Sequence, residues 1–368
     1  MSNSVFNTNK IDFSKQFLFF GEGRNVQEYI KPMYPQFTEL DLEMEGFFWG
    51  PTEIGLINDR NDYKKMDSGA QFIYTKNLQY QILLDSIQGR SPLLTILPAV
   101  TNPELESCII TWGFFEKIHS KSYTHIIKNL YSDPSEIVDA VLDIPQIIAR
   151  AKSIGESYDA LLKLVNQWMI DRSSVDQFEL HLALYKVLIS VNALEGIRFY
   201  VSFACNFAFE RNKQMLKSGS IMGLIARDES LHLSLTQKIL KIIHSGKDNP
   251  IWEQVIAYCV KHGIVEAIFR STAEQEKDWA TYLFQNGSVL GLTEGVLHQY
   301  IDHVTNKRMR AIGFTPIFPN TSNPMTWLES RLNSKGVQEA PQEVEKESYQ
   351  IGRINTNVSD DDFSDFDF

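Results

Sequence analysis

The sequence predicts an all-α protein built as a bundle of long helices. Strand signals are sparse, because few stretches alternate apolar and polar side chains, whereas apolar residues recur at helical spacing along most of the chain. Residues 187–209 contain only two charged side chains, which fits a helix buried on nearly every face at the centre of a large soluble protein. The composition, 43% hydrophobic and 22% charged, is ordinary for a globular chain of 368 residues.

The first helices can be placed from their boundary residues. Pro35 can stand at the first position of a helix that runs toward residue 48. A second helical pattern covers residues 65–88, and Gly89 with Pro92 beyond it can end that helix.

The same reasoning places the remaining elements. Further helices are expected at 103–129, at a short segment opened by Pro134, and at 146–169, 178–209, 212–243, 250–269, 272–284 and 293–311. A loop is expected at 171–176, and the Gly, Pro, Asn and Ser residues of 313–324 mark the exit from the helical body. At most a minor strand pair is expected.

Composition divides the chain into a helical domain, residues 1–332, and an acidic tail, residues 333–368. The tail carries nine acidic and three basic residues, so it holds −6 of the formal net charge of −11. Phe363, Phe366 and Phe368 stand among its last aspartates. Such a tail either keeps the protein soluble or becomes ordered on a partner, and the aromatic residues favour the second interpretation.

Charge and cysteine usage argue against several classes of protein. A net charge of −11 leaves no basic surplus for binding nucleic acid. The three cysteines are far apart and form no Cys-x-x-Cys pair, which fits a reducing compartment. The N-terminal residues lack the apolar segment of a signal peptide, so a cytoplasmic protein is expected. The two charges within residues 187–209 argue against a membrane span there.

Two Glu-x-x-His motifs indicate a metal site. Both lie within expected long helices, where residues three apart share a face and can reach the same ion. Two more carboxylates stand where charge is costly, one on the second helical pattern and one in the apolar helix. The chain order is then carboxylate, Glu-x-x-His, carboxylate, Glu-x-x-His: Asp85, Glu116, His119, Glu195, Glu229 and His232. Ferritin-like bundles that hold two iron or two manganese ions carry this arrangement.

The charges of this set support two metal ions. Four ionised carboxylates in one protein interior need counter-charge, and two divalent ions supply it. Oxygen-rich ligands with one imidazole per ion suit iron or manganese. Taken singly, the residues allow other interpretations: Asp85 could be a polar residue near a helix end, and Glu195 could form a buried ion pair with Arg198.

Tyr123 is the next candidate. It follows His119 by four residues and Glu116 by seven, so it shares their helix face, and a phenol one turn from a metal pair can be oxidised by it. Three apolar residues at helical spacing from the ligands could surround this phenol or could be ordinary core residues: Phe199, Phe203 and Ile225.

Four stretches closely resemble the small, radical-bearing subunit of class I ribonucleotide reductase, of the class Ia type. They are LLDSIQGRSP (83–92), EKIHSKSYTHIIKN (116–129), VNALEGIRFYVSFACNFAF (191–209) and LIARDESLHL (224–233). The resemblance covers nearly the whole chain. It implies a ferritin-like bundle with additional helices and a flexible C-terminal tail.

The resemblance also implies roles for individual residues. The six ligands would hold two irons per chain, with manganese a less favoured occupant, and Tyr123 would carry a stable tyrosyl radical in a pocket of Phe199, Phe203 and Ile225. Trp49 would relay electrons, and Asp228 would hydrogen-bond to His119. In the tail, Tyr349 would pass the radical onward, and Glu343 matches a family residue linked to that transfer.

The function implied is the supply of this radical to a separate large subunit, bound through the C-terminal tail, that reduces ribonucleotides to deoxyribonucleotides. A homodimer is expected from the family. The alternatives are a stand-alone di-iron oxygenase or oxidase and an iron-storing cage protein. The first would not need Tyr123 beside the metals or a tail with Tyr349. For the second, the chain is too long for a bare four-helix ferritin unit, and the acidic-aromatic tail would have no purpose.

Overall fold

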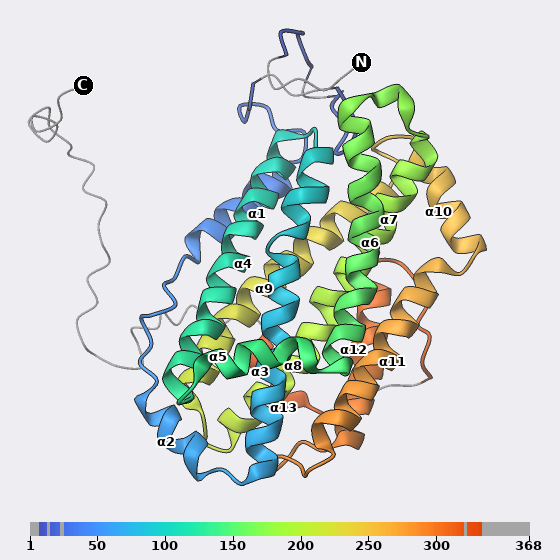
Figure 1. Ribbon diagram of the computed structural model, residues 1–368. Helices are drawn as coiled ribbons and strands as arrows, with labels where there is room; N and C mark the ends of the chain where they lie inside the picture. Colours follow the sequence, from blue (N-terminus) through green and yellow to red (C-terminus); the bar gives the residue numbers. More distant parts are fainter. Residues whose placement is uncertain (1–6, 13–14, 23–25, 320–321, 333–368) are drawn as a thin grey trace, which may run out of the picture. The chain divides into compact units, whose positions relative to one another are not determined.

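The computed structural model describes residues 7–12, 15–22, 26–319 and 322–332, most of which form helices (Figure 1). The all-α prediction is confirmed. Strand pairing within these ranges is limited to two isolated antiparallel bridges, Phe19 with Val100 and Val289 with Leu292. The expected tail, including Glu343, Tyr349 and its phenylalanines, lies outside the described residues.

Four long helical segments form the centre of the bundle (Figure 1). They are α3 (Ser68–Gln88), α4 (Pro103–Leu130), α9 (Leu216–His244) and a continuous rod made of α7 (Gln177–Ala193), the π-helical turn η6 (Leu194–Arg198) and α8 (Phe199–Arg211). Helix α3 packs against α4 and α8, and α9 packs against α4 and α8 from the other side. The four segments therefore enclose a common interior.

The remaining elements surround this centre. They are α1 (Pro35–Gly46), α2 (Ile57–Lys65), η2 (Pro92–Ile96), η3 (Leu97–Ala99), α5 (Pro134–Asp139), η4 (Ala140–Asp143), α6 (Pro145–Ile170), η5 (Arg172–Ser174), α10 (Ile251–Lys261), α11 (Ile264–Phe284), α12 (Glu294–Ala311) and α13 (Thr326–Leu332).

Local chemistry explains where the central helices begin. The Asp67 side chain accepts a hydrogen bond from the Ala70 amide and caps α3, and Asp176 accepts one from the Glu179 amide at the start of α7. Asn102 caps α4 in the same way, and a proline follows it at the first helical position.

The rod is the only helix within the described residues that is long and apolar enough to span a bilayer, and 94% of its most apolar window is buried inside the protein. It is therefore a core helix. The prediction of one plain helix over 178–209 missed its π-helical turn, which contains Glu195. The Arg308 Nε atom donates a hydrogen bond of 3.0 Å to the Gly196 carbonyl and so satisfies a polar group of this wider turn.

Three other predictions of elements were wrong in detail. Helix α2 was not expected. The break predicted near residues 270–271 lies instead at Gly263, which has a φ of +62° and separates α10 from α11. The chain does not leave the helical body at 313–324, because α13 follows and packs against α8 and α9. The expected loop at 171–176 contains a short 3-10 turn.

Candidate metal centre

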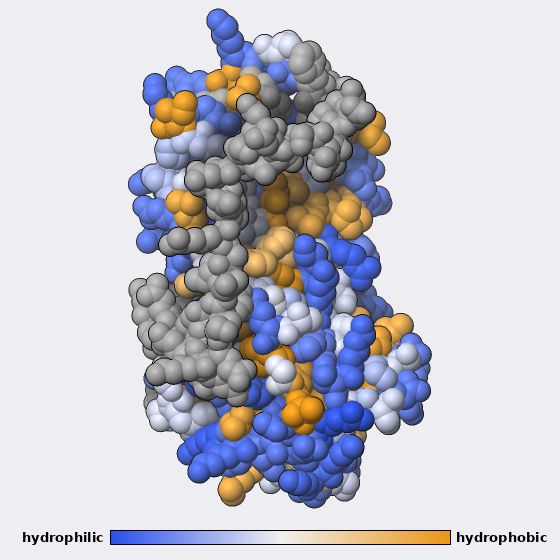
Figure 2. Space-filling model, turned by 90° about the vertical axis from the view of Figure 1, so that its left-hand side faces the viewer, coloured by the Kyte–Doolittle hydropathy of each residue, from blue (hydrophilic) through white to orange (hydrophobic). Residues whose placement is uncertain are grey.

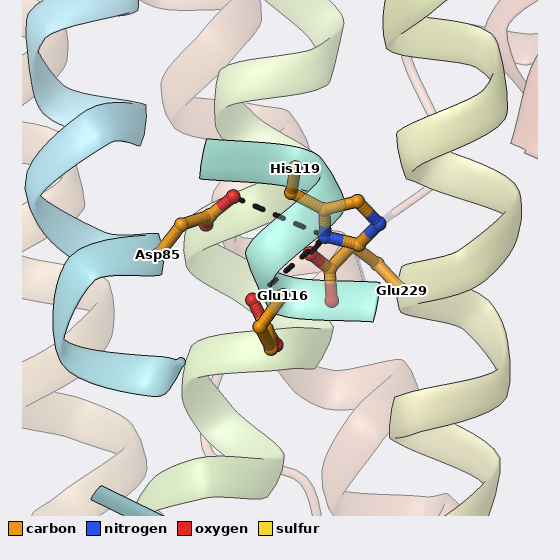
Figure 3. A group of neighbouring side chains, drawn as sticks. All are labelled: Asp85, Glu116, His119 and Glu229. Carbon is orange, nitrogen blue, oxygen red and sulfur yellow. Dashed lines mark ion pairs between the residues drawn. The ribbon is translucent and has the colours of Figure 1, made fainter. Parts of the chain in front are cut away.

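The six predicted ligands meet inside the bundle, and each is 0% exposed. Helix α3 contributes one, α4 two, the π-helical turn one and α9 two. Their side chains form two groups whose ligand atoms lie within 4.8 Å of one another: Asp85, Glu116, His119 and Glu229, and Glu116, Glu195, Glu229 and His232. Figure 3 shows the first group, with the side chains of three helices pointing toward one another.

Glu116 and Glu229 belong to both groups. One oxygen of Glu229 lies 3.0 Å from His119 Nδ1 and the other lies 2.9 Å from His232 Nδ1. Glu116 repeats this arrangement at longer range, with 3.8 Å to His119 Nδ1 and 3.4 Å to His232 Nδ1. Each glutamate therefore presents one oxygen toward each histidine, which is the geometry of a carboxylate shared between two neighbouring ions.

Many polar atoms of this cluster have no hydrogen-bond partner. Within the described part of the chain this holds for both oxygens of Asp85, for one oxygen each of Glu116, Glu195 and Glu229, and for Nδ1 of His119. A buried carboxylate oxygen without a partner costs considerable free energy, so such groups are normally paired or bound to metal. The donor set thus fits two divalent ions.

The pKa shifts within the cluster also indicate that bound cations would stabilise it. Burial, followed by the charge of Glu116, raises the pKa of Asp85 well above its usual range, and burial with the charge of Glu229 does the same to the pKa of Glu195. Burial alone would lower the pKa of His232, but the Glu229 carboxylate raises it to about 9. By themselves the six side chains balance their charges with protons, and metal ions would replace these protons.

Asp228 connects the cluster to Trp49. Its Oδ2 atom accepts hydrogen bonds from His119 Nε2 at 3.2 Å and from Trp49 Nε1 at 2.8 Å, and both partners are buried. Arg227 forms an ion pair of 3.1 Å with the other oxygen. Asp228 therefore fixes the orientation of His119 so that Nδ1 faces the carboxylates.

Tyr123 is 0% exposed, and its hydroxyl has no hydrogen-bond partner among the described residues. Burial, and then the charge of Asp85, raises the pKa of this phenol well above its usual range, so it stays protonated. Phe199, Phe203 and Ile225 are also 0% exposed, and the two phenylalanine rings stack with centroids 6.0 Å apart. That they surround the phenol stays a prediction.

Sequence reasoning missed three residues that hold the ligands. Trp112 donates a hydrogen bond of 2.8 Å to Glu116, and Gln88 donates one of 2.5 Å to Glu195. Tyr158 in turn donates to Gln88 at 2.7 Å. Helical spacing offered a signal for two of them, because Trp112 precedes Glu116 by four residues and Gln88 follows Asp85 by three.

The alternative interpretation of Glu195, an ion pair with Arg198, does not hold. Arg198 NH1 lies 3.0 Å from a carboxylate oxygen of Glu276 on α11. The Arg198 side chain thus has a different carboxylate partner, and Glu195 belongs to the cluster described above.

Comparison with known proteins agrees with this geometry. Residues 27–324 match the family model "Ribonucleotide reductase, small chain". The chain is 45% identical to the ribonucleoside-diphosphate reductase subunit beta of a Buchnera aphidicola strain and 43% identical to subunit beta of reductase 1 from Escherichia coli O157:H7, in each case over 100% of both chains. Subunit beta of phage T4 is 39% identical over 97% of each chain.

Solved structures share the fold. The R2 subunit from Clostridium botulinum gives a TM-score of 0.75 at 24% identity and covers 90% of this chain and 98% of that one. The dimanganese(II)-NrdF of Streptococcus sanguinis gives 0.65 at 20% identity and covers 85% of this chain and 100% of that one. The bundle is thus ferritin-like, as predicted. The full-length relatives named above favour a reductase subunit over the alternative of a stand-alone oxygenase or oxidase. On the model match and on full-length identity above 40%, the chain belongs to the small-chain family of ribonucleotide reductase.

Proposed function

We propose that this chain is the radical-generating subunit of a ribonucleoside-diphosphate reductase, and that the six clustered residues hold two metal ions. The sharing of Glu116 and Glu229 between the two ligand groups is the observation that carries this proposal. Asp85 and His119 would complete one ion site, and Glu195 with His232 the other.

The chain's own residues prepare Tyr123 for oxidation. When bound, the metal pair supplies a one-electron oxidation of the phenol at the expense of O₂. The buried hydroxyl next to the Asp85 charge stays protonated until that step, and the closed apolar surroundings keep water away from the resulting radical. We assign Phe199, Phe203 and Ile225 to these surroundings.

Trp49, Asp228 and His119 form a continuous hydrogen-bonded path to the first ion site, and we propose that electrons travel along it. Trp49→Phe removes the indole N–H that Asp228 accepts. It should leave the metal content unchanged and slow the appearance of the tyrosyl signal. Unchanged kinetics would remove Trp49 from the path.

We further propose that the tail joins this chain to the large subunit. Its charge of −6 and its three phenylalanines suit a segment that becomes ordered on a partner. Tyr349 would carry the radical across the subunit boundary, with Glu343 assisting the transfer.

Iron is the proposed metal, and the cytoplasm is the proposed location. The dimanganese protein named above shares only 20% identity with this chain, so its metal does not decide the metal of this site. Both metals suit the ligands, so metal analysis of protein purified from its source decides between them.

A homodimer is also proposed. Figure 2 shows the side of the molecule where α1 and α4 lie, with hydrophobic side chains gathered in patches among hydrophilic ones. Phe48 just after α1 is 64% exposed, and its ring lies 6.0 Å from that of Phe114 on α4. Leu42 and Ile110 on the same two helices are also exposed. Sedimentation of the full chain as a monomer would contradict this proposal.

The decisive experiment adds Fe²⁺ and O₂ to the metal-free full chain. Two irons per chain and a tyrosyl signal in electron paramagnetic resonance are expected. Metal uptake without any tyrosyl signal would favour an oxidase that acts on its own substrate.

A further inference from the structure

A cavity of about 410 Å³ opens between α6, α7 and α11, which lie beside one another in Figure 1. None of the six clustered ligands lines it. We propose that this cavity is a binding site for a small anion of the phosphate class. The proposal goes beyond the function proposed above and does not depend on it.

The lining has the chemistry of an anion site. Three side chains that are cationic or can become so, Lys186, Arg198 and His262, face it together with five hydroxyl groups, and no carboxylate lines it. The hydroxyls belong to Ser153, Ser157, Ser190, Ser271 and Thr272. Those of Ser153 and Ser157 already donate within α6, to the carbonyls of Arg150 and Ser153, which leaves the other three as donors for a ligand. Cationic groups combined with hydroxyl donors match the oxygens of a phosphate group.

The charge balance beside the cavity is positive. The Glu276 carboxylate, which is 0% exposed, accepts hydrogen bonds from Arg198 NH1 at 3.0 Å and Arg150 Nε at 3.1 Å. Tyr80 donates a third bond of 2.6 Å to the same oxygen. Two buried guanidinium groups thus share one carboxylate and leave a net charge of about +1.

Lys186 adds to this excess. It is half-buried on α7 and lines the cavity. Arg198 uses three of its five N–H donors, toward Glu276, Ser153 and Gln275. Donors therefore remain on Arg198 for a ligand, and an anion would neutralise the surplus charge where screening by water is reduced.

The volume sets the size of the ligand. Small-molecule sites usually measure about 300 to 1,000 Å³, so the cavity can take inorganic phosphate, pyrophosphate or a nucleoside monophosphate. The shared chemistry of these ligands is the phosphate group.

Equilibrium dialysis of the metal-loaded full chain against labelled inorganic phosphate tests the site, with pyrophosphate, adenosine monophosphate and citrate as competitors. Saturable binding of one phosphate per chain is expected. Whichever phosphate compound competes best identifies the source of the ligand. Competition by citrate equal to that by pyrophosphate would overturn the phosphate assignment.

Variants locate the binding. Lys186→Gln should weaken phosphate binding about tenfold, and Ser271→Asp, which places a carboxylate in the cavity, should abolish it. Lys163→Gln removes an exposed charge of α6 outside the lining and should change nothing. Helical circular dichroism and metal content show that each variant is folded. The proposal fails if the wild-type chain shows no saturable binding, or if both cavity variants bind as it does.

Discussion

In the proposed metal centre, Glu116 and Glu229 are the side chains expected to matter most. Each presents its two oxygens to two different histidines, so the loss of either removes a ligand from both ion sites. Asp85 and Glu195 each belong to a single ligand group. The loss of either side chain should therefore affect one ion more than the other.

The first prediction tests this difference. Glu229→Ala should lose both metal ions, because both sites lose an oxygen ligand and the remaining carboxylates lose their compensation by cations. Asp85→Ala should lose mainly one ion. Metal content per chain after gel filtration measures both. Glu266→Ala, which removes an exposed carboxylate paired with Arg270, is the control and should keep two ions. Two ions retained in Glu229→Ala would remove that residue from the centre.

The second prediction separates the metals from the radical. Tyr123→Phe keeps the volume and apolar character of a fully buried side chain and removes a hydroxyl that bonds to no described residue, so stability and metal content should stay close to wild type. The tyrosyl signal and ribonucleotide reduction with the large subunit should disappear. A persistent tyrosyl spectrum would place the radical on another tyrosine, and Tyr200 on α8, 6% exposed, would be the next to test.

At the scale of elements, the π-helical turn determines the direction of the Glu195 side chain. It interrupts the rod at the residues that carry Glu195, and a π-helical turn changes the direction of side chains relative to a plain helix. Arg308 on α12 packs against this turn, and its position leaves room only for glycine at 196, where a Cβ atom would lie 2.9 Å from Arg308 Cδ.

The third prediction follows from this contact. Gly196→Ala should force Arg308 away from the turn, destabilise the protein by about 1 to 3 kcal/mol and weaken the ion site that includes Glu195. Thermal unfolding and metal titration measure the two effects. The matched control is Gly155→Ala within α6, where a Cβ atom meets no other group within 4 Å. That change should raise stability by up to about 1 kcal/mol. Equal behaviour of the two variants would contradict the proposed role of the turn.

A comparison of the candidate ligands with the π-helical turn shows what could be predicted from the sequence. The candidate ligands were recognisable because charged residues stand at helical spacing in apolar surroundings. The π-helical turn was not recognisable, because residues 187–209 are apolar on nearly every face, so their sequence shows no clear helical periodicity that an extra residue could shift. Helix α2 (INDRNDYKK) was missed since it has almost no apolar residues, and the support of Glu195 by Gln88 and Tyr158 depends on which helices lie side by side.

At the scale of the whole molecule, the helical body and the tail have separate tasks in the proposed function. Within the described residues, the ligands and Tyr123 all lie between residues 85 and 232, and none belongs to the last helices of the body. Formation of the radical and its delivery to a partner should therefore be separable by mutation.

The last prediction tests this separation with two changes in the tail. Removal of residues 350–368 takes away five aspartates and three phenylalanines and leaves Tyr349 in place. Metal content and the Tyr123 radical should remain, while binding of the large subunit should weaken strongly. Tyr349→Phe should have the opposite effect, with normal binding and no turnover, because Phe is much harder to oxidise than Tyr. A peptide of residues 350–368 should compete with the full chain for the large subunit. Normal binding by the truncated chain would make the tail a solubilising segment, and turnover by Tyr349→Phe would exclude that residue from radical transfer.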